Sequence, residues 1–225
     1  MVHCAVYEVG RLADRAMVPR PMPMMVPVIM SGMLRKEKIV SANLANIVWP
    51  QHTERLTLRP VADADLPRIW SYRRLVSVSR WVSRSINDYE AFHAFYGAPR
   101  KMSEMVVLEH RGRVIGDLMV RVSDAWGQDE IADKAQATQA ELAWCLDPAY
   151  ARQGLATEAI EAQIRLCFED LGLRRVVASC FAANEPSWRL MQQVGMRREA
   201  HRRRDALHRD GNWYDTFDYA LLSDE

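Results

Sequence analysis

The sequence predicts a mixed α/β fold, in which a β-sheet contains at least one crossover unit. Strand, helix, strand and helix patterns follow one another between residues 140 and 194, and this alternation is typical of strands joined through a helix. Upstream, two apolar strands flank the turn residues His110-Arg111-Gly112, which is a hairpin signal. The chain has 225 residues, 49% hydrophobic and 26% charged. This length fits one domain plus a further segment, or two very small domains.

Each element follows from a local pattern. Alternating apolar and polar residues predict a strand over residues 55–59, which Pro60 ends. Asp63 and Asp65 then offer carboxylates that cap a helix start. The hairpin strands cover residues 104–109 and 113–121, and the polar residues 123–139 predict a loop. The later elements are a strand over 140–146, a helix over 155–171, a strand over 175–181, a helix over 185–194 and strand material up to residue 222.

Residues 1–52 differ in composition from the rest of the chain. They hold seven of the twelve methionines and five of the ten prolines, and the run from Pro19 to Pro27 cannot form a helix. Prolines also interrupt the apolar patch that a secretory signal needs, and no clear cleavage site follows. We expect residues 1–52 to be a disordered extension, or to precede a true start at Met30 or Met33. Residues 53–225 form the expected domain.

Charge and cysteine usage exclude several protein classes. Thirty basic and 29 acidic residues give a formal net charge of +1, so the whole chain is not a polycation that attracts nucleic acid. No apolar run reaches the ~18 residues that a membrane span requires. The four cysteines lack paired CxxC spacing, which argues against a zinc site and a disulfide framework. We therefore expect a reduced, cytoplasmic monomer or homodimer without a membrane, metal or nucleic-acid partner.

The turn over residues 152–157 predicts an anion site. A strand ends at Asp147, and a short loop leads into a helix whose first turn carries Gly154 and Ala156. Small residues there let a ligand approach the backbone, and the free amides of a helix N-terminus favour anions. Arg152 adds a positive charge. The alternative is that Gly154 only permits a tight turn and Arg152 is a solvated surface charge.

A second helix follows the strand over residues 175–181. Asn184 is placed to be its N-cap, Pro186 lies in its first turn, and Gly195 ends it. Each feature alone only indicates a well-formed helix. The informative feature is the order: an acidic strand, the Arg-Gln-Gly-x-Ala helix, a strand and the Asn-x-x-Ser helix.

In this order of motifs the sequence resembles the GNAT superfamily of acyl-CoA-dependent N-acetyltransferases, from Thr53 to Leu222. The family pattern Q/R-x-x-G-x-G/A falls on residues 151–156, with Ala151 at the place of the usual glutamine or arginine. The chain looks most like the branch with the ribosomal-protein-alanine N-acetyltransferases. That branch shares the continuation Thr157-Glu158-Ala159, the Asn184-x-x-Ser187 motif with Gly195, and Gly211-x-Trp213-x-Asp215 with Tyr219.

The resemblance implies a twisted mixed sheet flanked by helices and a fold that binds acetyl-CoA as a co-substrate. It implies that the pyrophosphate rests on backbone amides of the turn, where side chains are replaceable. The departure at Ala151 therefore lowers the expected affinity for phosphate more than it argues against the family resemblance. The pantetheine arm is expected to pair with the strand over residues 142–146 like an added strand. The implied cofactor-binding residues are Leu146, Arg152, Gln153, Gly154, Leu155, Ala156, Thr157, Asn184 and Ser187.

The implied reaction moves an acetyl group to a primary amine. It needs a deprotonated amine, aligned reactants, a stabilised oxyanion and a protonated or tolerated thiolate. Met191 stands where many relatives have a tyrosine that is thought to act as the general acid, and a methionine cannot donate a proton. Ser187 matches the serine that is proposed to interact with the leaving thiolate in the branch. Glu141 and Asp205 are the candidate bases. Ser187 can equally be a capping or solvated hydroxyl, and each acid a surface charge.

The acceptor stays open at this level. A protein N-terminus, in particular a ribosomal one, and a small-molecule amine both fit. Six arginines between Arg197 and Arg209 could steer an acidic acceptor or form a solvated face, and we expect His201 and His208 to lie in an exposed basic loop. Four tryptophans could line an acceptor pocket or the core: Trp70, Trp81, Trp144 and Trp188. The alternative functions are a non-catalytic acyl-CoA-binding module and an arginine-rich nucleic-acid binder.

Overall fold

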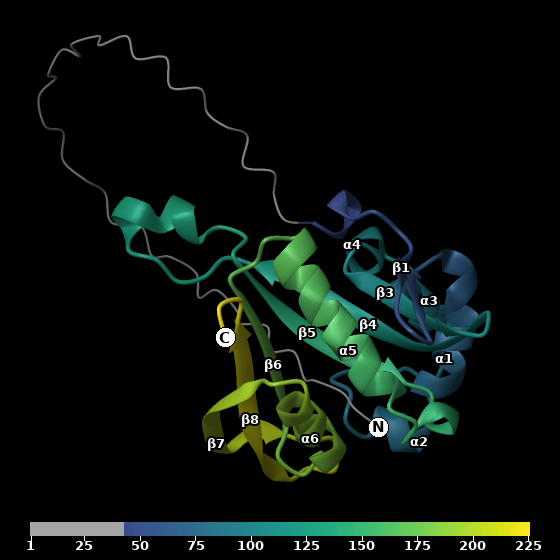
Figure 1. The fold of residues 1–225 in the computed structure, drawn as a ribbon. Helices are drawn as coiled ribbons and strands as arrows, with labels where there is room; N and C mark the ends of the chain where they lie inside the picture. Colours follow the sequence, from purple (N-terminus) through teal and green to yellow (C-terminus); the bar gives the residue numbers. More distant parts are fainter. Residues whose placement is uncertain (1–42) are drawn as a thin grey trace, which may run out of the picture. The chain divides into compact units, whose positions relative to one another are not determined.

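The computed structural model describes residues 43–225, and Cys4 and most of the expected N-terminal extension lie outside the described residues. Its centre is an eight-stranded sheet in the order β1-β2-β3-β4-β5-β6-β8-β7 (Figure 1). All neighbouring strands are antiparallel except β5 and β6, which are parallel and joined through a helix. The strands are β1 Gln51–His52, β2 Thr57–Pro60, β3 Met105–His110, β4 Arg113–Ser123, β5 Gln139–Leu146, β6 Arg175–Phe181, β7 Arg197–Leu207 and β8 Trp213–Leu222.

Helices cover both faces of this sheet. The core between the sheet and α5 and α6 contains Leu142, Ile160 and Leu190. The core on the other face contains Ile69, Phe92 and other residues of α1 to α4. Figure 1 shows α5 and α6 on the same side of the strands. The helices are α1 Leu66–Arg73, α2 Val76–Ser79, α3 Tyr89–Tyr96, α4 Pro99–Met102, α5 Leu155–Arg165, which continues as a π-helical turn Leu166–Asp170, and α6 Glu185–Gln193.

The sequence predicted the mixed α/β class and the order of the main elements correctly. The predicted hairpin turns at Arg111 and Gly112, both of which have positive φ angles, as the twist of a tight hairpin requires. The main differences lie at the ends of elements. Pro60 belongs to β2 instead of ending it, because β1 pairs only with Thr57 and Leu58 and leaves this position at a sheet edge. The expected loop before β5 contains a 3-10 helix, Asp129–Ala135.

The described residues before Thr53 pack onto the domain. Leu44 and Ile47 are buried in the larger core. Trp49 packs against the same core and donates a hydrogen bond from Nε1 to the Leu44 carbonyl oxygen over 2.9 Å. The packed residues therefore begin upstream of the expected boundary at residue 53.

The two parallel strands separate soon after they meet. Only residues 139–141 of β5 pair with residues 175–177 of β6. Beyond this point β5 stays paired with β4 up to Leu146, and β6 stays paired with β8 up to Phe181. The edge of β5 that faces β6 is thus free of β6 over residues 142–146. This divergence, which we call the splay, has α5 and α6 on one face and α1 to α4 on the other.

Candidate functional site

The loop before α5 has the backbone geometry of an anion site. Gly154 is the N-cap residue and adopts φ +75°, a left-handed conformation that glycine tolerates best. Arg152, two residues earlier, also has a positive φ of 60°. The helical hydrogen-bonding begins with Glu158 N, which donates to the Gly154 carbonyl oxygen. The amides of residues 155–157 therefore donate to no group of the helix and remain available to a ligand.

Arg55 holds this loop in place, and sequence reasoning gave it no role. Its Nη1 donates to the Gln153 carbonyl oxygen over 2.8 Å, and its Nε donates to Glu158 over 2.7 Å. A Cβ atom on Gly154 would lie 3.3 Å from Arg55 Nη2, so the guanidinium lies directly against the loop. About a hundred residues separate the partners, so no local pattern could reveal the contact.

Glu158 is the second half of this clamp. Its carboxylate accepts hydrogen bonds from Thr53 Oγ1 over 2.5 Å and from Arg55 N over 2.7 Å. Burial acts to raise the pKa of Glu158, but these hydrogen bonds outweigh it and lower the pKa. The carboxylate is therefore charged at neutral pH and fixes the first turn of α5.

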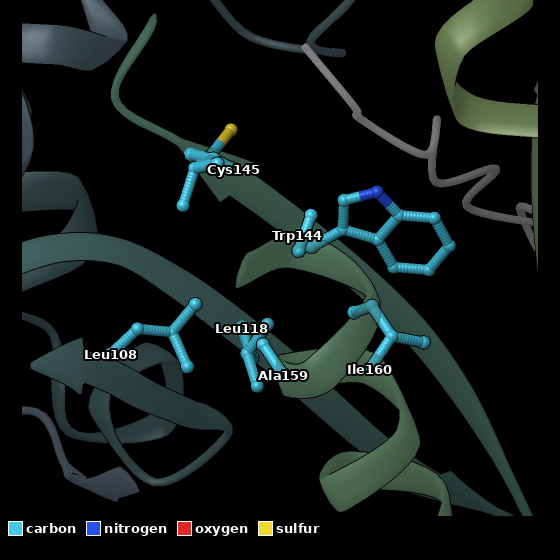
Figure 2. A pocket seen from close by; sticks show the side chains of 8 residues that line it. Leu108, Leu118, Trp144, Cys145, Ala159 and Ile160 are labelled. Carbon is cyan, nitrogen blue, oxygen red and sulfur yellow. The ribbon is translucent and has the colours of Figure 1, made fainter. Parts of the chain in front are cut away.

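The side of β5 that faces α5 is closed to a ligand. Figure 2 shows Leu108, Leu118, Ala159 and Ile160 gathered between the strands and the helix. The cavity among them is about 10 Å³ and its lining is largely apolar. That volume is at most the size of one water molecule. A ligand beside β5 therefore has to use the open edge of residues 142–146, with Leu146 at its far end.

Glu141 lies at the apex of the splay. It is the last residue of β5 that pairs with β6, opposite Val177, and its other neighbour across the sheet is Arg121 on β4. Arg121 Nη1 lies 3.3 Å from Glu141 Oε2, and Arg121 Nε lies 3.4 Å from Glu104 Oε2. Burial raises the pKa of Glu141, the Arg121 charge opposes this rise, and the Glu104 charge adds to it. Glu141 is therefore a partly buried carboxylate that binds a proton more readily than a solvated glutamate does.

Ser187 lies next to β6, the other strand of the splay, on the face that α5 and α6 cover. It is in the first turn of α6, fully buried, and its hydroxyl has no hydrogen bond of good geometry among residues 43–225. Its effect on the pKa of the Cys180 thiol shows that the hydroxyl lies beside β6. Asn184 occupies the expected N-cap position, where its carbonyl oxygen accepts from Ser187 N over 3.0 Å, and it is also fully buried.

The structure separates the two candidate bases. Asp205 lies on β7, which β6 and β8 separate from β5. At about 4.8 Å between neighbouring strands, this is roughly 14 Å along the sheet. The Asp205 carboxylate accepts a hydrogen bond from Thr216 Oγ1 over 2.8 Å. The structure therefore brings Glu141, but not Asp205, to the point where the strands separate.

One expectation about the histidines is wrong. His201 is exposed and lies 2.6 Å from Asp215, but His208 is buried. Its ring packs against three aromatic rings with centroid distances between 5.2 and 5.5 Å. The aromatic partners come from three separate segments, Trp81, Phe181 and Tyr214, and a pattern within the arginine-rich segment does not reveal them.

No group of three or more His, Cys, Asp and Glu side chains among residues 43–225 is arranged to hold a metal ion. None of the helices in this part of the chain combines the length and the apolar character that a bilayer span requires.

Comparisons with known proteins agree with this geometry. The profile of the family described as "Acetyltransferase (GNAT) domain" matches residues 55–197. The uncharacterised N-acetyltransferase YnaD of Bacillus subtilis is 35% identical over 176 residues, which are 77% of this chain and 96% of that protein. A GNAT-family acetyltransferase from Bacillus anthracis superposes with a TM-score of 0.66 at 24% identity and covers 77% of this chain and 98% of its own. The RimJ protein of Mycobacterium smegmatis, solved in complex with CoA-disulfide, has a TM-score of 0.61 at 21% identity, with coverages of 75% and 82%.

The splayed sheet, the glycine turn and these similarities define an acyltransferase enzyme. The chain belongs to the GNAT acetyltransferase family.

Proposed function

We propose that the protein transfers an acetyl group from acetyl-CoA to a primary amine by direct transfer within a ternary complex. The observation that carries this proposal is the splay. It leaves one backbone edge, a carboxylate and a buried hydroxyl around a single gap, next to the glycine turn. The CoA complex of the similar RimJ protein supports the choice of donor.

The residues present fit the donor. The backbone amides of residues 155–157 would hold the pyrophosphate, and the charge of Arg55 lies next to them. The free edge over residues 142–146 would pair with the pantetheine arm. Acetyl-CoA supplies the acetyl group in activated form, as a thioester.

Glu141 and Ser187 then divide the proton chemistry between the two faces of the gap. Glu141, on the face of α1 to α4, takes a proton from the acceptor ammonium group, directly or through water. The amine nitrogen then forms a bond to the acetyl carbon, the bond from that carbon to sulfur breaks, and the second proton that the nitrogen loses passes to the thiolate, which leaves as the CoA thiol. Ser187, on the face of α6, offers its hydroxyl as a hydrogen-bond donor to the departing thiolate. Because Asp205 is distant and already bonded to Thr216, we assign the base to Glu141.

The same site argues against a covalent enzyme intermediate on Cys145. Cys145 lies on the open edge itself, and burial raises the pKa of its thiol to about 12. A thiol with this pKa stays protonated at neutral pH and is a poor nucleophile. Figure 2 shows its sulfur pointing away from the group of apolar side chains below β5.

Thermal unfolding of the full chain with and without acetyl-CoA tests the proposed donor. At about 100 times its Kd, a ligand adds about 2.7 kcal/mol to the free energy of unfolding. For a domain of this size the expected rise in Tm is roughly 5–10 °C. If the Tm does not change at saturating acetyl-CoA, the proposal is wrong, and with it the role of the glycine turn.

Replacing Ser187 with alanine separates catalysis from stability. The hydroxyl is buried and its one neighbouring partner among residues 43–225 is the weakly bonding Cys180 thiol, so its removal should change the Tm little. The value of kcat should fall by about tenfold or more, because a hydrogen bond to the charged leaving thiolate contributes about 1.5–3 kcal/mol. Ser179→Ala is the matched control, since Ser179 lies on the same strand as Cys180 but donates to Asp218 over 2.8 Å. An undiminished kcat in Ser187→Ala would remove Ser187 from the mechanism.

A further inference from the structure

The acceptor has to reach the gap from the face of α1 to α4. The proposed pyrophosphate site lies at the start of α5, and α5 and α6 cover the opposite face. Glu141 is on the face of α1 to α4, because the charges that act on it come from Arg121, Glu104 and Lys101, the last of which is in α4. The acceptor amine must come within reach of this base, so the surface around this face decides which amines are accepted.

The segment over residues 79–84 lies on this face, with Val82 buried in its core. At one end the Trp81 ring packs against Phe181, at the last position of β6, with a centroid distance of 5.9 Å. His208, after β7, packs on the same ring and bonds through Nε2 to the Arg80 carbonyl oxygen over 2.8 Å. These contacts attach the segment to the β6 arm.

At its other end the segment packs against α3, and its Val82 is buried in the core that also contains Cys145 of β5. The Arg84 guanidinium lies 4.5 Å from the centre of the Phe95 ring in α3. It is close enough to Tyr96 to oppose the burial that raises the pKa of that phenol. Tyr96 in turn accepts a hydrogen bond from Arg73, whose partner Asp117 pairs across the sheet with Cys145 of β5.

The exposed charges along this segment are positive and lack carboxylate partners. Arg80, Arg84 and Arg209, which we call the arginine rim, are exposed and form no ion pair among residues 43–225. Arg209 is tied to the segment by a hydrogen bond to the Val82 carbonyl oxygen. The neighbouring acids are already used. Asp210 accepts from Asn212 N and Tyr214 Oη and contacts His208, and Asp88 caps α3.

Stacking prepares two of these side chains to bind a carboxylate. Arg80 lies 4.6 Å from the centre of the Trp81 ring, and Arg84 is held in the same way on Phe95. A guanidinium fixed over a ring still presents donors along its edge, and that edge matches a carboxylate in two parallel hydrogen bonds. Arg80 also lies within hydrogen-bonding reach of the Tyr214 hydroxyl, and its charge acts to lower the pKa of that phenol. Two such groups on one short segment favour an acceptor with negative charge close to its amine.

We propose that the arginine rim selects acceptors that carry a carboxylate within a few atoms of the reacting amine. The inference rests on the proposed acetyl transfer and adds the class of acceptor. Such a group can belong to a peptide with Asp or Glu at its second to fourth positions, or to a free amino dicarboxylic acid.

Acetylation of matched acceptors tests this selection in the full-length protein. Three peptides share an N-terminal alanine and differ at positions 2–4, where they carry Asp and Glu, Asn and Gln, or Lys. Aspartate and glutamate are compared in parallel with asparagine and glutamine, which separates the peptide source from the small-molecule source. We expect kcat/KM to be about tenfold higher for the acidic acceptor than for its amide counterpart in at least one series, since two partly exposed ion pairs contribute a modest amount each. The preference should shrink as salt is raised.

Charge reversal identifies the side chains responsible. Arg80→Glu with Arg84→Glu should abolish or invert the preference, while the Tm rise with acetyl-CoA is retained. Arg165→Glu with Arg174→Glu makes the same change in charge at exposed positions away from the splay and should keep the preference. Arg80→Lys with Arg84→Lys keeps the positive charges but removes the planar guanidinium donors. This variant should retain only part of the preference for acidic acceptors.

Three results would overturn the inference: equal rates for acidic and amide acceptors, a preference that survives the reversal at Arg80 and Arg84, or no transfer to any acidic acceptor. In each case a Tm rise with acetyl-CoA leaves the proposed donor in place. If the Tm rise and acetyl transfer are both absent, the proposed function is wrong as well.

Discussion

Replacing Gly154 with aspartate should weaken acetyl-CoA binding by at least about 100-fold, which corresponds to about 2.7 kcal/mol. The carboxylate would stand on the loop where the backbone amides are expected to hold the pyrophosphate, and like charges repel. It would also compete for Arg55, because a Cβ atom at this position lies 3.3 Å from Arg55 Nη2. Isothermal titration of the purified variant with acetyl-CoA measures the effect.

Gly172→Asp is the matched control for this change. Gly172 has φ +64°, close to the +75° of Gly154, so aspartate experiences a similar backbone strain there. A Cβ atom at Gly172 meets no heavy atom within 4 Å. Both variants should lose comparable stability, but only Gly154→Asp should lose affinity for acetyl-CoA. Equal affinity in the two variants would place the pyrophosphate elsewhere.

The contrast between Gly154 and Arg55 shows what the sequence can reveal about this site. The turn residues 152–157 form a local pattern. Glycine at position 154 already indicates a positive φ at the helix N-cap, because glycine tolerates this conformation best. Arg55 reaches the same loop from about a hundred residues away through side-chain hydrogen bonds. Such a contact exists only after the sheet has formed, so spacing along the chain carries no sign of it.

The same distinction explains Glu141 and His208. An acid inside an apolar strand is visible in the sequence, whereas its position at the last β5–β6 pair follows from where the two strands diverge. His208 stands within a run of arginines, which suggests an exposed loop. It is buried because aromatic rings from three distant segments surround it. Periodicity predicts which face of an element is apolar, but not which distant segment covers a polar residue.

Replacing Glu141 with glutamine should lower kcat by about 100-fold or more, the usual contribution of a general base. The side chain keeps its size, so the acetyl-CoA affinity and the fold should be retained. In the natural protein the base must be deprotonated, and burial raises its pKa. Activity should therefore fall as the pH decreases through this raised pKa. The dependence of kcat on pH, measured with saturating acceptor and acetyl-CoA, records this acidic limb of the bound complex, which should disappear in Glu141→Gln.

Glu104→Gln provides the control that connects the pH limb to this particular carboxylate. The negative charge of Glu104 adds to the rise in the pKa of Glu141, and Glu104 also shares Arg121 with it. Removing the charge should lower the pKa of Glu141, because the neighbouring repulsion is lost and Arg121 can turn fully to its remaining partner. The acidic limb should then move to lower pH while the rate at high pH is maintained. The acceptor amine is the same in both proteins, so its own titration cannot produce a difference between them. A limb that stays in place in Glu104→Gln, or that persists in Glu141→Gln, would assign the proton transfer to another group.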